Sequence, residues 1–134
     1  EITMYINSPG GSVTDGLALY DVMAGIPCPI RTVCVGMAAS MGALLFAAGN
    51  KRDMLPHAAV MIHDPLTTGI SGSALGVEQA SRRLMETREI TASILADHTG
   101  HTIEEVYEKT RQDSYFNAEE AVAWRLADRI ITGI

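Results

Sequence analysis

The stretch IRTVCVGMAASMGALLFAAG, residues 30–49, contains the pattern on which the fold depends. Its first part, Ile30–Gly36, is short and rich in β-branched residues, which is typical of a β-strand. Its last part, Ala43–Gly49, is apolar on all sides, and its alanine and leucine content favours a buried helix over a strand. The sequence therefore predicts a strand followed closely by a buried helix, with Ser40 between them.

The segments on both sides of this stretch extend the same pattern. Ile2–Ile6 alternates apolar and polar residues and stops at Asn7–Gly11, which predicts a strand followed by a sharp turn. A helix capped by Ser12 is expected next. Because strand, helix and strand alternate, the first two strands are expected to be parallel. The apolar run Ala59–Ile62 predicts a third buried strand, which ends at His63.

The second half of the chain is predicted to be mainly helical. The polar, glycine-rich segment Thr67–Ser73 is expected to be either an ordered loop or a weak, mobile strand. A long helix follows it and ends near Gly100, because apolar residues recur there every three to four positions. Two capping boxes, Thr102–Glu105 and Asn117–Glu120, predict short helices, and Ile130–Thr132 suggests a closing strand.

The composition fits a single domain, residues 1–134, with a mainly aliphatic core. Of the 134 residues, 47% are hydrophobic and 5% are aromatic. The 16 acidic residues exceed the 10 basic ones and the net charge is −6, so neither nucleic acid nor an anionic membrane is an expected partner. The apolar run Gly42–Gly49 is far shorter than the roughly 20 residues that span a bilayer. No transmembrane segment is therefore expected.

The two cysteines, Cys28 and Cys34, do not predict a metal site, because they form no CxxC pair and have no histidine partners at ligand spacing. Both are interpreted as reduced thiols in the core, which favours a cytoplasmic location. The first residue is Glu1 rather than Met, and the pattern of a strand starts at once with Ile2. We therefore expect the chain to be a fragment whose N-terminal segment is missing.

Two consecutive glycines, Gly10 and Gly11, end the first strand. Glycine adopts backbone angles that are closed to other residues and leaves its amide N–H uncovered, so such a turn can hold an anion. A tight connection from a strand to a helix explains the same motif. A short motif of this kind is more often structural.

Ser40 is a candidate nucleophile. Because it opens a buried helix, its Oγ and the Met41 amide are expected at the positive end of the helix dipole. Its neighbours Ala39 and Gly42 are small, as a nucleophile turn requires. The alternative is that Ser40 is a helix cap, as most serines at helix starts are.

His63 and Asp113 are candidates for a general base and the carboxylate that orients it. His63 ends its strand at the same edge of the sheet as the glycine turn and Ser40, where sites in parallel sheets gather. Asp64 is a poor orienter, because neighbouring side chains of a strand point to opposite faces. A hydrogen-bonded structural histidine and a turn aspartate are the alternatives. Together these residues favour acyl transfer by a serine nucleophile.

Five blocks of the sequence resemble the ClpP family, the proteolytic subunits of the Clp protease. They follow the order of the family and span the whole chain: Asn7–Val13, Gly36–Gly42, Met61–Leu66, His98–Gly100 and Asp113–Ala121. The resemblance implies a crotonase-like α/β fold built from repeated β-β-α and βαβ units. It also implies that a long helix and the glycine-rich segment before it, residues 67–99, form a handle between two rings of subunits.

The resemblance implies roles for individual residues. Ser40 would be the nucleophile, His63 the general base and Asp113 the carboxylate that orients the histidine. The N–H groups of Gly11 and Met41 would stabilise the oxyanion.

The resemblance also implies a substrate and partners. Val13, Pro65 and Leu66 would lie along an extended substrate peptide that is held by backbone pairing. The protein would be a serine endopeptidase subunit that cuts unfolded polypeptides into short peptides, without a cofactor. Its subunits would form heptameric rings stacked as a tetradecamer, and an ATP-dependent AAA+ unfoldase of the ClpX, ClpA or ClpC type would feed them.

Two positions depart from the pattern of the family. Gln112 stands where an arginine commonly helps to join the two rings, and Asp64 replaces the usual glutamine after the histidine.

Two alternatives to this function remain. One is a non-catalytic ring subunit that keeps the fold without the chemistry, against which the intact Ser40, His63 and Asp113 argue. The other is a different member of the crotonase superfamily: a peptidase of the phage prohead type or the signal-peptide type, or an enzyme that acts on acyl thioesters. The His98–Gly100 and Gln112–Tyr115 blocks favour the ClpP family over this second alternative.

Overall fold

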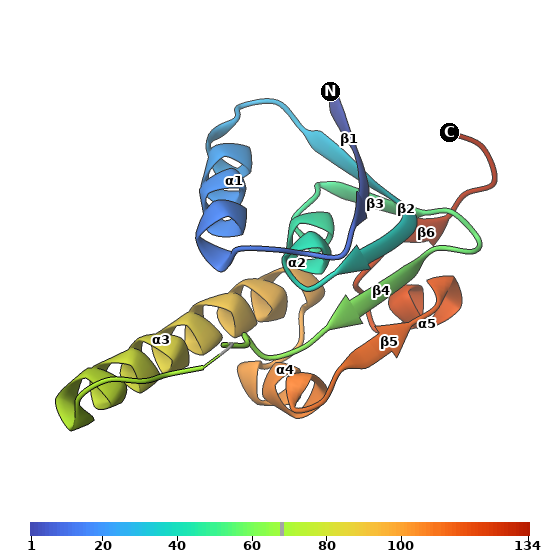
Figure 1. Cartoon of the computed structure of the whole chain (residues 1–134). Helices are drawn as coiled ribbons and strands as arrows, with labels where there is room; N and C mark the ends of the chain where they lie inside the picture. The colour runs from blue at the N-terminus through green and yellow to red at the C-terminus, as the bar shows by residue number, and fades with distance from the viewer. Residues whose placement is uncertain (68) are drawn as a thin grey trace.

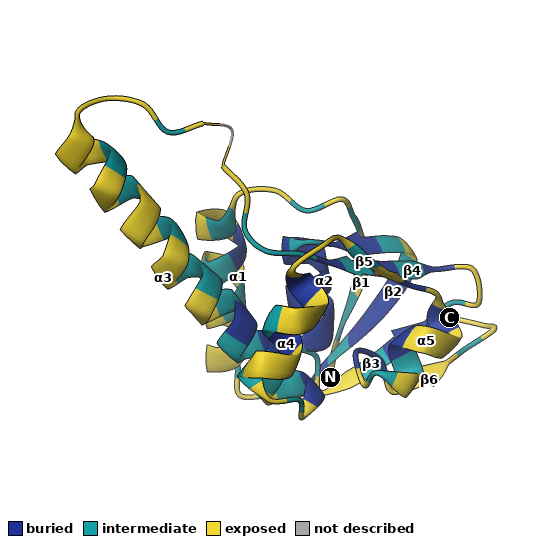
Figure 2. Cartoon of the chain, turned by 90° about the horizontal axis from the view of Figure 1, so that it is seen from below, coloured by how far each residue is buried: buried dark blue, intermediate teal, exposed yellow. Residues whose placement is uncertain are grey.

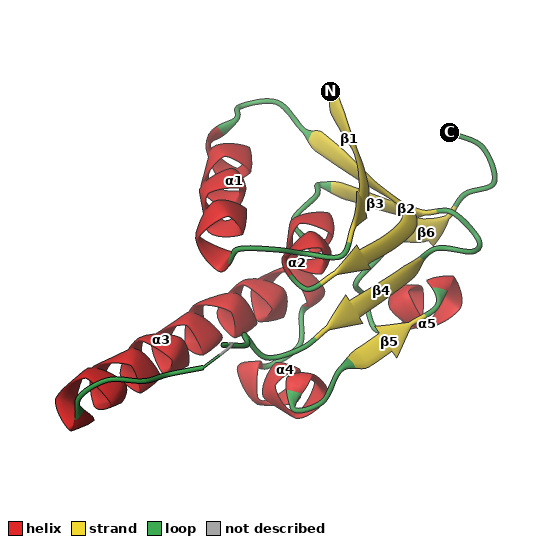
Figure 3. Ribbon diagram, viewed as in Figure 1, coloured by secondary structure: helices red, strands yellow, loops and turns green. Residues whose placement is uncertain are grey.

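The computed structural model describes residues 1–67 and 69–134 and shows helices packed against one twisted sheet (Figures 1 and 3). The elements in chain order are β1 (Ile2–Ser8), α1 (Val13–Gly25), β2 (Ile30–Ala39), α2 (Met41–Ala47), β3 (Lys51–Met54), β4 (Ala59–Ile62), α3 (Ala74–Thr99), α4 (Ile103–Thr110), β5 (Ser114–Phe116), α5 (Ala118–Ala123) and β6 (Arg129–Ile130).

Among the described residues, six strands form one sheet with β2 at its centre. β2 pairs in parallel with β1, with β3 through Arg31–Cys34, and with β4 through Met37–Ala39. β3 also pairs in parallel with β6, whereas β4 and β5 are antiparallel. The predicted α/β class with parallel strands is therefore confirmed, and one edge of the sheet is antiparallel.

The helix α2 forms the centre of the core. It contacts β1, β2 and β4 on one side and α1 and α3 on the other, and Figure 2 shows it buried along most of its length. The largest of its buried side chains are Leu44 and Phe46. The apolar character of residues 43–49 thus predicts both the helix and its burial.

The long helix α3 extends away from the rest of the molecule (Figure 1). Ser73 caps it, as its side chain accepts a hydrogen bond from the N–H of Gly76 at 3.1 Å, and Gly100 ends it in the left-handed conformation with φ 78°. One face of its last turns is buried, at Ala92, Leu95 and Thr99, whereas its N-terminal half is mostly exposed (Figure 2). In the segment before it, residues 67 and 69–73 form a loop, and Thr68 lies outside the described residues.

Three features of the fold differ from the prediction. The sequence pattern does not predict β3 or β5, and the closing strand is Arg129–Ile130 rather than Ile130–Thr132. Cys34 is fully buried, and burial raises the pKa of its thiol to about 11, but Cys28 lies in the loop before β2 and is only partly buried. Placing Cys28 in the core is therefore wrong.

No helix of the described residues is long and apolar enough to cross a membrane.

Asp53 joins three strands through a buried ion-pair network. Its carboxylate is 1% exposed and accepts hydrogen bonds from Arg31 Nε on β2 at 2.6 Å and from Arg129 Nε on β6 at 2.8 Å. Burial alone would raise the pKa of the Asp53 carboxyl, but the hydrogen bonds from Arg129 and Arg31 outweigh it and hold the pKa below its ordinary value.

We expect Asp53→Asn to lower the free energy of unfolding by about 2 kcal/mol at pH 7, because both arginines lose a charged acceptor. Since the folded pKa of Asp53 lies below the unfolded value of about 3.9, the ionised form stabilises the fold above that pH. This contribution is lost as the pH falls through the folded pKa. Urea unfolding from pH 3 to pH 7 measures it, and the difference between the two proteins should shrink below about pH 4. A constant difference would contradict the assignment, and Glu108→Gln, in the exposed pair with Arg111, is the control.

Candidate active site

Ser40 lies at the turn between β2 and α2 in a backbone conformation that residues other than glycine rarely adopt. Its φ is 59° and its ψ is −120°, and its side chain makes no hydrogen bond that caps α2. The turn is held by the strand β4, because the N–H of Ser40 donates to the carbonyl oxygen of Met61 at 2.9 Å. Strain of this kind persists where the surroundings enforce it, often at functional sites. Because the Ser40 side chain makes no capping hydrogen bond, it does not act as a helix cap.

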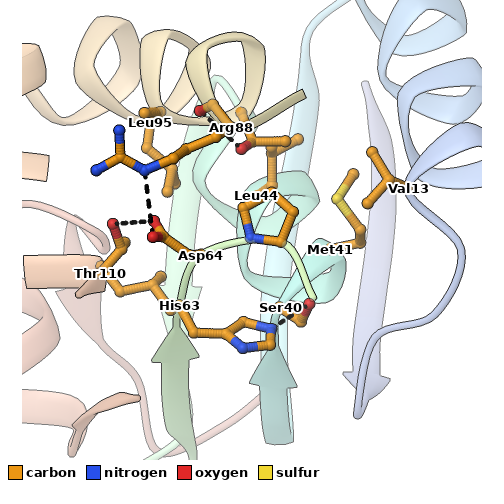
Figure 4. Close-up of a pocket in the computed structure, with 13 residues that line it drawn as sticks. Val13, Ser40, Met41, Leu44, His63, Asp64, Arg88, Leu95 and Thr110 are labelled. Atoms are coloured by element: carbon orange, nitrogen blue, oxygen red, sulfur yellow. Dashed lines mark hydrogen bonds and ion pairs between the residues drawn. The ribbon is translucent and has the colours of Figure 1, made fainter. Parts of the chain in front are cut away.

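His63 lies beside Ser40 because β4 is the neighbour of β2. The register pairs Ala39 with Met61, so the residues that follow the two strands meet at one edge of the sheet. The distance between His63 Nε2 and Ser40 Oγ is 2.8 Å (Figure 4). When Ser40 donates in this hydrogen bond, the neutral imidazole carries its hydrogen on Nδ1.

Asp113 faces the other nitrogen of the imidazole, at a longer distance. β5 pairs antiparallel with β4 and sets Ser114 opposite Ile62, so that Asp113 lies next to His63. His63 Nδ1 is 3.4 Å from Asp113 Oδ1, and this buried nitrogen has no hydrogen-bond partner among the described residues. The side chain of Asp113 is 58% exposed. The contact is close but is not a formed hydrogen bond, and bonds of this type often shorten when substrate binds.

The glycine turn after β1 passes directly over Ser40. Gly10 has a φ of 101°, and a Cβ at this position would lie 2.7 Å from Ser40 Cβ and 2.9 Å from the carbonyl oxygen of Ala39. Only a residue without a side chain fits here. Gly11, the next residue, meets no atom at its Cβ position. The N–H of Met41 belongs to the first turn of α2, where backbone donors lack partners within the helix.

A pocket adjoins Ser40 and His63, between α2, the loop after β4 and α3 (Figure 4). Val13, Met41 and Pro65 also line it. Leu66 is not among the lining residues and is 77% exposed. Gly11 lines a separate hollow beside β1 and α1, to which Met41 also contributes.

Asp64 is turned away from the hydrogen bond between Ser40 and His63. Its carboxylate contacts Arg88 Nε on α3 at 3.2 Å and Thr110 Oγ on α4 at 3.1 Å (Figure 4). These partners lie 24 and 46 residues away, so no local spacing in the sequence could have indicated them. The close approach of Gly10 to Ser40 is likewise a tertiary contact that the motif alone does not reveal.

Comparison with known protein families agrees with this geometry and with the resemblance of the motifs. The family model described as Clp protease matches residues 1–133 of the 134 in the chain. The match includes every residue of the candidate site. The chain belongs to the Clp protease family.

Proposed function

We propose that this chain is a serine endopeptidase subunit of the ClpP type, with residues 1–134 as one peptidase domain. The observation that carries the proposal is the distance of 2.8 Å between Ser40 Oγ and His63 Nε2, on a serine whose backbone is held at positive φ. Membership of the Clp protease family supports peptidase chemistry at this pair. A nucleophile needs a base within hydrogen-bonding distance, and His63 meets this requirement.

In the proposed reaction, His63 Nε2 accepts the proton of Ser40 as Oγ attacks the carbonyl carbon of a peptide bond. The imidazolium then returns this proton to the leaving amine as the C–N bond breaks. Water hydrolyses the acyl-enzyme by the same proton transfers. Asp113 orients the imidazole and stabilises its positive charge, for which the distance to Nδ1 must shorten from 3.4 Å by about 0.5 Å.

The N–H groups of Met41 and Gly11 are the proposed donors to the oxyanion. Met41 follows the nucleophile at the start of α2, and the close contact of Gly10 with Ser40 keeps the glycine turn beside the reacting atoms. Donors of this kind stabilise charge that develops only in the transition state. Val13 and Pro65, which line the pocket, and Leu66, which is exposed beside it, are the proposed contacts of an extended substrate peptide.

The proposed substrates are unfolded polypeptides, and the proposed assembly is two heptameric rings stacked as a tetradecamer and fed by an AAA+ unfoldase of the ClpX, ClpA or ClpC type. Family membership supports association with other subunits and with an unfoldase. The exposed apolar side chains of α3, Leu75, Met85 and Ile90, suit burial between subunits. The handle of residues 67–99 would supply this contact.

A fluorophosphonate probe tests the proposed function, because it phosphonylates only an activated serine. We expect one adduct per chain, located on Ser40 by mass spectrometry of peptides. Ser40→Ala should take up no probe, whereas Ser81→Ala, which removes an exposed serine of α3, should react like the unmodified sequence. Labelling that persists in Ser40→Ala would contradict the proposal.

A further inference from the structure

Asp64, the residue after His63, is held by two helices (Figure 4). Its N–H donates to the carbonyl oxygen of Thr110 at 3.0 Å, and its carboxylate accepts a hydrogen bond from Arg88 Nε at 3.2 Å. The hydroxyl of Thr110 lies 3.1 Å from the same carboxylate, 2.8 Å from the carbonyl oxygen of Val106 and 3.4 Å from that of Tyr107, so its single hydrogen is shared among three acceptors. Asp64 thus ties the end of β4 to α3 and to α4.

The same end of α4 sets the position of Asp113. Thr110 is the last residue of α4, and Asp113 follows three residues later. Arg88 also braces this helix, because its guanidinium lies 3.8 Å from the centre of the Tyr107 ring. A shift of Asp64 would therefore change the spacing between the segment that carries His63 and the segment that carries Asp113.

The cluster is partly buried and its charges are paired. The cation that offsets Asp64 is Arg88 of α3, and their side chains are 35% and 25% exposed, so water screens their charges only in part. From α4, the packed titratable group is Tyr107, beneath the guanidinium. Removing either Asp64 or Arg88 leaves the other without its counter-charge and weakens the anchor.

We propose that Asp64 is a positioning residue for His63, and that Arg88 and Thr110 hold it in place. This inference rests on the proposed roles of Ser40 and His63. Asp64 acts through the backbone that it shares with His63 and through its anchor on α4. Arg88 holds the Asp64 carboxylate against Thr110 of α4 and balances the negative charge of Asp64.

The test compares Arg88→Gln with Asp64→Asn in the full chain, by the rate of fluorophosphonate labelling of Ser40 at pH 7, divided by the concentration of folded protein. Each variant should react about tenfold more slowly than the unmodified sequence, because the spacing of the reacting groups is loosened. The double variant should react no more slowly than either single variant, because the two side chains hold the same anchor.

Further variants separate this positioning role from a purely structural one. Arg88→Lys keeps the cation and should restore most of the rate, and Thr110→Ser should react faster than Thr110→Val because it keeps the hydroxyl. The matched control is Arg82→Gln, which breaks the exposed ion pair with Glu78 on the same helix and should not change the rate.

Arg88→Gln and Asp64→Asn proteins that fold and react within twofold of the unmodified sequence would overturn the inference, and so would an Arg88→Lys protein that reacts no faster than Arg88→Gln. If Arg88→Gln or Asp64→Asn fails to fold, as judged by circular dichroism, the Thr110 variants decide: equal rates for Thr110→Ser and Thr110→Val would overturn the inference. Absence of labelling at Ser40 in the unmodified sequence would instead overturn the proposed function, so the two failures are distinguishable.

Discussion

Ser40→Ala is expected to lower kcat for peptide hydrolysis by about 10⁵- to 10⁶-fold, because it removes the atom that attacks the carbonyl carbon. His63→Ala should cost a similar factor, since its Nε2, 2.8 Å from Ser40 Oγ, is the proposed acceptor of the proton. The two residues act as a unit, so the double variant should be no slower than either single variant. Cleavage of a fluorogenic peptide, divided by the concentration of folded protein, measures these rates.

The control for this comparison is His57→Ala. His57 is exposed in the loop between β3 and β4, and its loss should leave the rate unchanged. Losses that multiply in the double variant of Ser40 and His63 would show that the two side chains act independently and would contradict the shared role. A His57→Ala protein as slow as His63→Ala would contradict the assignment of the base.

Gly10→Ala is expected to slow fluorophosphonate labelling of Ser40 by about 100-fold. The added Cβ would lie 2.7 Å from Ser40 Cβ, and the φ of 101° is unfavourable for alanine. The turn must therefore move away from Ser40 and carry the N–H of Gly11 with it. The free energy of unfolding should fall by about 1–3 kcal/mol, the usual cost of such backbone strain. Labelling kinetics and urea unfolding of the same preparation measure the two effects.

Gly25→Ala is the matched control for this substitution. Gly25 ends α1, its φ is not positive, and an added Cβ would meet no atom within 4 Å. Labelling of Ser40 should be unchanged, and the stability should rise slightly because alanine restricts the unfolded chain more than glycine does. If Gly10→Ala reacts with the probe within twofold of the unmodified sequence, the contact between the turn and Ser40 has no role in the site.

The elements that the sequence predicts well are those that depend on residues a few positions apart. Both capping boxes form as predicted, with Thr102 and Glu105 in one and Asn117 and Glu120 in the other. Ser12 also caps α1 as expected, through the N–H of Asp15. The motifs also name the three residues of the proposed triad, whose roles stay a proposal. Local hydrogen bonds and apolar periodicity explain these successes, because both are encoded within one or two helical turns.

The tertiary structure alone decided how distant segments combine. β5 has three residues and no alternating pattern, yet its pairing with β4 brings Asp113 to 3.4 Å from His63, 50 residues away in sequence. Likewise, β3 contains the charged Asp53, and two arginines from other strands, Arg31 and Arg129, pair with its buried carboxylate. Strand pairing and burial stabilise β3 and β5 through contacts with residues that are remote along the chain. The residues within a short segment therefore do not predict these strands.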